Sequence, residues 1–262
     1  MGKITDALKK AAQERLSRLE KLDKREDLKY QFIVKKTVDS KIDPRIVTFY
    51  DSKSSVAEQY RTLRTNIQAI NSKQPIKAIT ITSSIHGEGK TITAINLAIS
   101  MAHDLGKKNI LLVDADLRRA RISRYLGVNA ELGLADLIAN GTNIDEALLN
   151  IGIDNLTILP AGKIPNNPAE LLGSLKMKNL VSLLKTKYDY IIFDTPPVIP
   201  VTDAGLVGAQ TDGVIMVIQA ERTQKGVVEH GEGLLHQAQA KLLGYILTNI
   251  QYHIPGYIYR YL

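Results

Sequence analysis

Cysteine and tryptophan are absent from the 262 residues, and phenylalanine occurs only three times. Without cysteine, the chain can form neither disulfides nor thiolate metal sites. The five histidines show no ligand spacing such as H-E-x-x-H, so the sequence predicts no zinc site. Tyrosine is the abundant aromatic residue, with eleven occurrences.

Long apolar runs are also missing, and none approaches the roughly 18–20 residues that span a bilayer. The first residues, MGKITDALKK, turn polar too early for the apolar region of a signal peptide. Asp6 stands where a myristoylation signal needs Ser or Thr. We therefore expect a cytoplasmic protein.

Positive charge is concentrated at the start of the chain. Residues 1–36 contain 11 Lys or Arg and 6 Asp or Glu, which accounts for +5 of the net charge of +7. A basic end suits an acidic partner, a membrane surface or nucleic acid, but a solvated helix explains it equally well. Nucleic acid is not expected as a partner, because only Tyr30 and Phe32 could stack on bases there.

The spacing of apolar residues divides the chain into three parts. Apolar residues recur at three- and four-residue steps over residues 1–30, which predicts an amphipathic helix. Residues 31–54 are typical of a linker, so residues 1–54 are predicted to be a basic helix and linker. Residues 55–251 are predicted to form one α/β domain, and residues 252–262 a tyrosine-rich tail.

Within the central part, strands and helices alternate after a first helix with Ser54 or Ser55 as its N-cap. Strands are predicted at 76–82, 109–113, 156–159, 190–193, 214–218 and 243–250, and helices at about 91–105, 167–187, 203–210 and 223–241. Several strands are apolar throughout, as parallel strands buried on both faces are. The pattern predicts a doubly wound, mostly parallel sheet with helices on both faces and a ligand at the carboxyl ends of the strands.

The first of these strands leads into SSIHGEGKT, residues 83–91, and then into a helix. Glycines let the backbone amides turn toward phosphate oxygens, and the helix N-terminus adds a partial positive charge. Lys90 is predicted to reach the β- and γ-phosphates, and the Thr91 hydroxyl to bind Mg²⁺. The standard pattern has glycine where Ser84 stands. The predicted ATP-binding residues are Ser84, His86, Gly87, Glu88, Gly89, Lys90 and Thr91.

Carboxylates follow two further strands. Asp114 and Asp116 follow ILLV, and Asp194 follows YIIF. Parallel strands end at the same edge, so all three should lie beside the phosphate loop. Mg²⁺ needs hard oxygen ligands, and an attacking hydroxyl needs a proton acceptor. A single aspartate at a strand end is more often a turn residue, but three beside a phosphate loop favour a reaction site.

These motifs together resemble the bacterial tyrosine kinases (BY-kinases) of capsule and exopolysaccharide biosynthesis, which are P-loop autokinases related to the Min and Par ATPases. The resemblance covers residues 55–262 and includes the helix at 58–67, the phosphate loop, LPAG at 159–162, NPAELL at 167–172 and FDTPP at 193–197. It implies that Lys90, Asp114 and Asp116 are catalytic, and that Thr91, Asp114 and Asp194 hold Mg²⁺. Which of Asp114 and Asp116 is the base stays open. The partition ATPases carry a signature lysine where Ile85 stands here, which favours the kinases.

Glu58, Arg61 and Arg64 form an E-x-x-R-x-x-R pattern that spans about 120° of a helix. We expect these charges to face outward while Leu63 and Ile67 pack inward. The spacing alone is typical of a solvated helix face. The resemblance implies that the motif holds subunits in a ring.

The last 11 residues contain four tyrosines, Tyr252, Tyr257, Tyr259 and Tyr261, which we predict to be phosphoacceptors. Each phosphate would add about −1.5 to −2 charges. The alternation of YIYRYL also fits a C-terminal strand. A second cluster, Arg118, Arg119, Arg121 and Arg124, suits phosphate or an acidic activator segment, or is a solvated face.

The sequence therefore predicts an ATP- and Mg²⁺-dependent protein-tyrosine autokinase that phosphorylates its tail in trans. The resemblance implies a membrane activator that recruits it to the inner face of the membrane, protein tyrosine substrates, and a role in polysaccharide export. The alternatives are a partition-type ATPase switch and a nucleotide-binding adaptor that does not turn over ATP.

Overall fold

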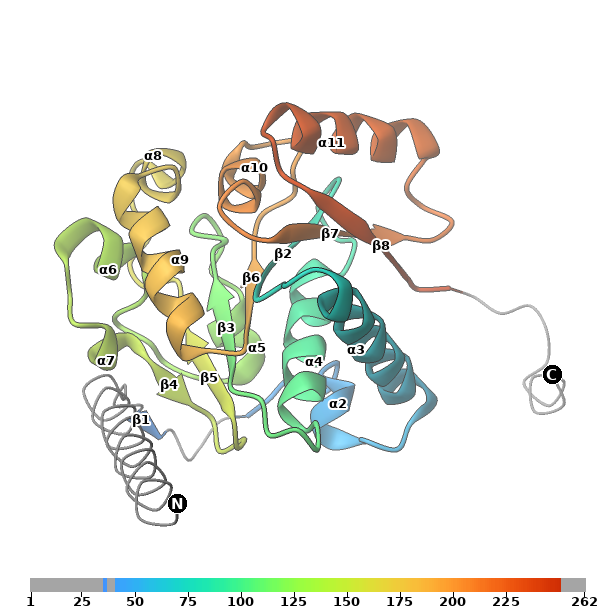
Figure 1. Ribbon diagram of the computed structural model, residues 1–262, viewed down its shortest axis with the longest axis horizontal. Coiled ribbons are helices and arrows are strands. Elements are labelled where there is room, and N and C mark those ends of the chain that lie inside the picture. The colour runs from blue at the N-terminus through green and yellow to red at the C-terminus, as the bar shows by residue number, and fades with distance from the viewer. Residues whose placement is uncertain (1–34, 37–40, 251–262) are drawn as a thin grey trace, which may run out of the picture. The chain divides into compact units, whose positions relative to one another are not determined.

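A single sheet organises the part of the chain that the computed structural model describes, residues 35–36 and 41–250. Its eight strands there lie in the order β1-β4-β5-β3-β6-β2-β7-β8 (Figure 1). Among these strands, only β4 and β5 pair antiparallel. The strands are β1 (Lys35–Lys36), β2 (Ala78–Ser83), β3 (Ile110–Asp114), β4 (Leu149–Asn150), β5 (Leu156–Leu159), β6 (Tyr190–Asp194), β7 (Gly213–Gln219) and β8 (Leu242–Thr248).

Helices cover both faces of the sheet. On β7, Ile215 and Val217 belong to the core that includes α4, whereas Val214 and Met216 belong to the core under α10 and α11. Successive residues of a strand point to opposite faces, so these are two separate cores. Figure 1 shows α3 and α4 side by side. The helices are α2 (Val47–Tyr50), α3 (Ser55–Lys73), α4 (Lys90–Ala102), α5 (Ile122–Leu126), α6 (Leu134–Asn140), α7 (Ile144–Ala147), α8 (Pro168–Leu172), α9 (Leu175–Lys187), α10 (Asp203–Gly208) and α11 (Lys225–Gln237).

The structure confirms the predicted α/β class and the mostly parallel sheet. Each of the six predicted strands is present, displaced by at most a few residues at its ends. Ser54 is the N-cap of α3, and its side chain accepts a hydrogen bond from the Ala57 amide. In the described ranges, no helix has both the length and the apolar character needed to cross a bilayer.

The single helix predicted over 167–187 is wrong, because two helices, α8 and α9, occupy this range. Gly173 ends α8, and the Ser174 side chain accepts a hydrogen bond from the Met177 amide at 3.2 Å to start α9. A serine that caps a new helix competes with continuation of the old one.

The linker predicted over 31–54 is wrong for residues 41–54, which pack on the domain. The compact unit that holds the described residues begins at Val34. Ile42 and Ile46 are buried in the core, and Thr48 donates a backbone and a side-chain hydrogen bond to Asn96 of α4, both at 3.0 Å. The predicted helix over 1–30 and the four tail tyrosines lie outside the described residues.

Candidate active site

The phosphate loop joins β2 to α4, as the sequence predicts. Gly87 and Gly89 have φ angles of 89° and 94°, in the left-handed region that glycine adopts without strain. Gly89 is the N-cap of α4 and offers no capping side chain, so the first amides of this 13-residue helix stay available. Free amides and the positive end of the helix dipole make this an anion-binding position.

Two of the predicted ATP-binding side chains point elsewhere. Ser84 is fully buried, and its hydroxyl lies 3.4 Å from the sulfur of Met216. The buried carboxylate of Glu88 accepts hydrogen bonds from the Ile85 amide at 2.8 Å and from the Thr223 hydroxyl at 2.5 Å. Both side chains therefore shape the loop, and only its backbone is left to meet a ligand at these positions.

Residues from the far end of the chain also hold the loop, and the sequence motifs did not reveal them. The Thr248 hydroxyl at the end of β8 donates to the Glu88 carbonyl at 2.8 Å. The Arg222 guanidinium, after β7, donates to the His86 carbonyl at 3.2 Å. These contacts fix the outer turn of the loop against the ends of two strands.

The three predicted carboxylates do meet the phosphate loop. Asp114 and Asp194 end the paired strands β3 and β6 and lie opposite each other in register. The Lys90 ammonium is 3.0 Å from Asp116 and 3.7 Å from Asp194. Burial lowers the pKa of Lys90, but the charges of Asp194 and Asp116 outweigh it and raise the pKa overall. Lys90 therefore keeps its positive charge at the centre of the site.

The two strand-end carboxylates differ in their hydrogen bonds. Asp114 accepts from the backbone amides of Asp116 and Ile122, at 3.2 and 2.9 Å. Neither oxygen of Asp194 has a hydrogen-bond partner among the described residues. Burial raises the pKa of both carboxyls. The charge of Asp194 raises the pKa of Asp114 further, the charge of Asp116 raises both pKa values, and the charge of Lys90 partly offsets these effects. The Lys90 ammonium, 3.7 Å away, is too distant for a hydrogen bond, and a buried carboxylate without hydrogen bonds is costly unless a further cation or water meets it.

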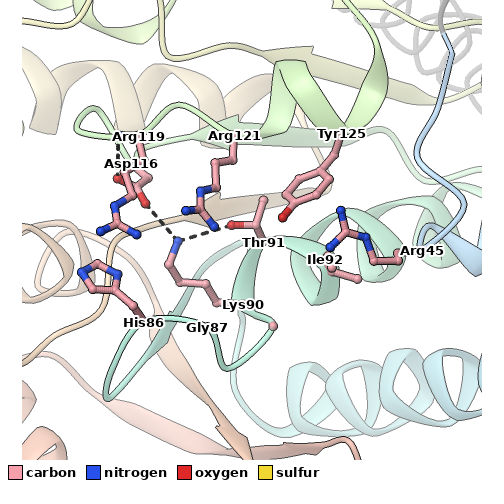
Figure 2. A pocket seen from close by; sticks show the side chains of 11 residues that line it. Arg45, His86, Gly87, Lys90, Thr91, Ile92, Asp116, Arg119, Arg121 and Tyr125 are labelled. Carbon is pink, nitrogen blue, oxygen red and sulfur yellow. Dashed lines mark hydrogen bonds and ion pairs between the residues drawn. The ribbon is translucent and has the colours of Figure 1, made fainter.

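A cavity of about 200 Å³ opens beside Lys90. Figure 2 shows the Lys90 ammonium pointing toward Asp116, with Arg119 and Arg121 above it. Burial and the positive charges of Arg119 and Lys90 lower the pKa of His86 at the edge of the cavity. The cavity is lined by Arg45, His86, Gly87, Gly89, Lys90, Thr91, Ile92, Asp116, Arg119, Arg121 and Tyr125, a set with four Lys or Arg and one acid. It therefore favours anions.

The predicted arginine cluster is divided between separate environments. Arg119 and Arg121 line the cavity, whereas Arg124 does not. Arg118 donates two hydrogen bonds, at 2.8 and 2.9 Å, to the fully buried carboxylate of Asp203 at the start of α10. Arg118 therefore ties the segment after β3 to α10. Arg45 and Tyr125 also line the cavity and were missed, because neither lies in a recognisable motif.

The sequence predicts that all three charged residues of the E-x-x-R-x-x-R pattern face outward. In the structure, they do not all do so. The exposed fraction of the side chains falls from 62% for Glu58 to 37% for Arg61 and 16% for Arg64. Arg61 binds Glu58 and the Ser52 carbonyl, and Arg64 donates to the Ser100 carbonyl at 2.6 Å. Arg64 is thus held on α4, while Glu58 and Arg61 remain at the surface.

Comparison with known proteins adds independent findings. A family model described as an AAA domain matches residues 76–238. Tyrosine-protein kinase YwqD of Bacillus subtilis (strain 168) is 37% identical over 215 residues, covering 82% of this chain and 90% of that protein. The putative tyrosine-protein kinase CapB of Staphylococcus aureus is 35% identical over 76% of this chain and 86% of its own length.

Several solved structures are also similar to this chain. The chimerical protein CapA2B2 is similar with a TM-score of 0.76 and 31% identity, over 84% of this chain and 95% of that chain. The kinase domain of the Escherichia coli tyrosine kinase ETK has a TM-score of 0.75 and 27% identity, and the match covers 80% of this chain and 82% of that chain. The septum site-determining protein MinD of Pyrococcus horikoshii OT3, complexed with Mg-ADP, has a TM-score of 0.57 and 26% identity. This match covers 70% of this chain and 75% of that chain.

Proposed function

Because the chain belongs to the bacterial tyrosine-protein kinase family of P-loop proteins, we propose that it is an ATP-dependent autokinase that phosphorylates its own C-terminal tyrosines. Family membership confirms the resemblance inferred from the motifs. The observation that carries the proposal is the meeting of Lys90, Asp116 and Asp194 beside the glycine-rich loop. A kinase needs this combination to hold a triphosphate and to accept a proton.

In this proposal, the phosphates of ATP lie on the loop. The backbone amides around Gly87 and Gly89 and the N-terminus of α4 bind phosphate oxygens. Lys90 turns from Asp116 to the β- and γ-phosphates, and His86, neutral because of its lowered pKa, borders the site. The backbone of the loop at Ser84 and Glu88 supports this cradle without side-chain contacts to the nucleotide.

The chain has groups that fit Mg²⁺. The oxygens of Asp194, which accept no hydrogen bond within the described residues, suit a cation or its water ligands, and the Thr91 hydroxyl and Asp114 complete the predicted set. In the described part of the chain, no three His, Cys, Asp or Glu side chains gather tightly enough to hold a metal by themselves. The ion would therefore also take oxygens from phosphate and water. When bound, Mg²⁺ neutralises charge that develops on the phosphates.

Asp116 is the base in this proposal. Both carboxyls are buried, but Asp116 lines the cavity, whereas Asp114 does not and accepts a backbone hydrogen bond at each of its two oxygens. A tyrosine hydroxyl has a pKa of about 10 and is a weak nucleophile at neutral pH. Its oxygen attacks the γ-phosphorus, the bond to the β–γ bridging oxygen breaks, ADP leaves, and the phenolic proton passes to Asp116.

The acceptors proposed are Tyr252, Tyr257, Tyr259 and Tyr261 of a neighbouring subunit. Glu58 and Arg61 stand exposed on α3, where charged pairs with another subunit can form. Arg64 acts indirectly, because it anchors α3 on α4. We propose that this face of α3 assembles the ring in which tails reach neighbouring active sites. Phosphorylated tails would carry enough negative charge to loosen the ring.

The proposed partner is a membrane activator that recruits the kinase to the inner face of the cell membrane. Support comes from the similar solved chimera, CapA2B2, whose name joins a second component, CapA, to CapB. The exposed Arg119 and Arg121 offer an acidic segment a place beside the cavity. The process proposed is capsule or exopolysaccharide biosynthesis and export, with protein tyrosines as substrates and no role for nucleic acid.

The alternative is a partition-type ATPase switch, and the structural similarity to MinD supports it. It would release ADP and phosphate from ATP without forming phosphotyrosine. The missing signature lysine at Ile85 favours the kinase.

A mixing experiment tests the kinase and its trans reaction together. Lys90→Met, with an intact tail, is incubated with Mg·ATP and the variant whose four tail tyrosines are Phe. Neither protein alone should form tail phosphotyrosine, whereas the mixture should phosphorylate the tail of Lys90→Met. Wild-type ADP release without any phosphotyrosine, with the membrane activator present, would instead establish the ATPase switch.

A further inference from the structure

Two segments carry the carboxylates at the centre of the site. Residues 115–121 follow β3 and include Asp116, and residues 195–202 lead from Asp194 at the end of β6 to α10. We call them the Asp116 segment and the Asp194 segment. They lie side by side where they leave the sheet, because the Ala115 amide donates to the Asp194 carbonyl at 2.8 Å.

The Asp194 segment is held on the end of β2. The Thr82 hydroxyl donates to the Pro196 carbonyl at 2.8 Å, and the Val198 amide donates to the Ser83 carbonyl at 2.9 Å. The segment leads to Asp203, whose carboxylate is fully buried at the start of α10. Asp203 is therefore a fixed point, anchored to the strand that also carries the phosphate loop.

The Asp116 segment meets this fixed point through Arg118. The Nε and Nη2 groups of Arg118 donate to the two carboxylate oxygens of Asp203 at 2.8 and 2.9 Å. Such a bidentate pair fixes direction as well as distance. Arg118 belongs to the same tight turn as Asp116, because the amides of Arg119 and Ala120 donate to the Asp116 carbonyl at 3.1 and 2.8 Å. We call the Arg118–Asp203 ion pair the clasp.

Lys90 is a second link between the two segments, because its ammonium lies 3.0 Å from Asp116 and 3.7 Å from Asp194. In the proposed reaction, Lys90 turns to the phosphates, and the Asp116 carboxylate loses the hydrogen bond from it. The clasp is not exchanged in this way, since neither Arg118 nor Asp203 lines the cavity. A ligand in the cavity therefore does not compete for it.

We propose that the clasp positions Asp116 to accept the tyrosine proton once Lys90 has turned to the phosphates. Arg118 and Asp203 are positioning residues, because they act through the turn that carries Asp116. The inference rests on the proposed kinase function, in which Asp116 is the base. The rival explanation is that Arg118 only balances the buried charge of Asp203.

The test uses the full chain with its four tail tyrosines changed to Phe, so that only an added peptide, residues 251–262, accepts phosphate. Arg118→Gln should lower kcat for peptide phosphorylation about tenfold or more and leave the ATP KM within about twofold. The phosphate loop is unchanged in this variant, so only the step that needs Asp116 slows. Arg118→Lys should recover little of the lost kcat, because an ammonium cannot form the bidentate pair.

A double variant separates positioning from charge balance. Arg118→Gln alone leaves the buried carboxylate of Asp203 without its cation, which lowers the midpoint of thermal unfolding. Combining Arg118→Gln with Asp203→Asn removes both charges, so the midpoint should return toward that of the parent while kcat stays low. Recovery of kcat together with the midpoint would overturn the inference and support the rival explanation. A raised ATP KM with an unchanged kcat in Arg118→Gln would overturn it as well.

Arg124→Gln is the matched control, because Arg124 is exposed on α5 and does not line the cavity. Its kcat and ATP KM should equal those of the parent. If the parent forms no phosphotyrosine on the peptide, the kinase proposal itself fails, and that result is seen before any clasp variant is compared. If such a parent still releases ADP, the ADP-release rates of the same variants test whether the clasp positions Asp116 to accept a proton from water.

Discussion

Replacing Lys90 with Met is expected to lower the rate of tyrosine phosphorylation by about 10³-fold or more. The Lys90 ammonium lies 3.0 Å from Asp116 and 3.7 Å from Asp194, at the centre of the charges around the cavity. Methionine keeps most of the apolar stem but removes the only Lys or Arg that the phosphate loop itself supplies. The measurement is the initial rate of phosphotyrosine formation with Mg·ATP.

Lys178→Met is the matched control, because Lys178 is exposed on α9. It should leave the rate unchanged. A Lys90→Met rate within tenfold of wild type would contradict the assigned role. Arg119 or Arg121 would then be the cation that stabilises the transferred phosphoryl group.

Replacing Gly133 with Ala is expected to destabilise the domain by about 3 kcal/mol or more. A Cβ at Gly133 would lie 2.2 Å from both the Gly162 amide nitrogen and the Pro160 carbonyl oxygen. These are backbone atoms, so no side-chain movement can relieve the clash. The two segments are also hydrogen bonded, since the amides of residues 134 and 135 donate to the carbonyls of residues 160 and 161 at 2.8 and 2.9 Å.

Thermal unfolding measures this effect, and the midpoint should fall by roughly 6–12 °C. Gly226→Ala, in α11, is the control because a Cβ there meets no atom within 4 Å. That change should stabilise the domain slightly, since alanine favours helix over glycine. An unchanged midpoint for Gly133→Ala would mean that the loop before α6 can separate from the segment after β5.

The site could be predicted from the sequence where its residues follow strands. Asp114 and Asp194 end continuously apolar strands, Lys90 follows β2 through the glycine-rich loop, and parallel strands bring such ends to one edge. The same reasoning could not decide which carboxylate faces the ligand. That distinction depends on the backbone amides that meet Asp114 and on the absence of such partners at Asp194, both of which are tertiary features.

Other parts of the site carry no local signal. Arg45 lies in a short segment with a proline, and its apolar residues, among them Ile42 and Ile46, are too few in number to establish a period. Burial of these two isoleucines nevertheless fixes the segment beside the cavity. Likewise, Arg222 and Thr248 reach the phosphate loop only because β7 pairs with β2 in the sheet and β8 pairs with β7. Their roles follow from strand order, which the sequence pattern does not define.

Peptide mass spectrometry after incubation with Mg·ATP and the membrane activator tests the central claim most directly. The wild-type chain should carry phosphate on one or more of Tyr252, Tyr257, Tyr259 and Tyr261, and the variant with all four changed to Phe should carry none in its tail. Steady ADP release from a wild-type chain whose tail stays unmodified would contradict the account.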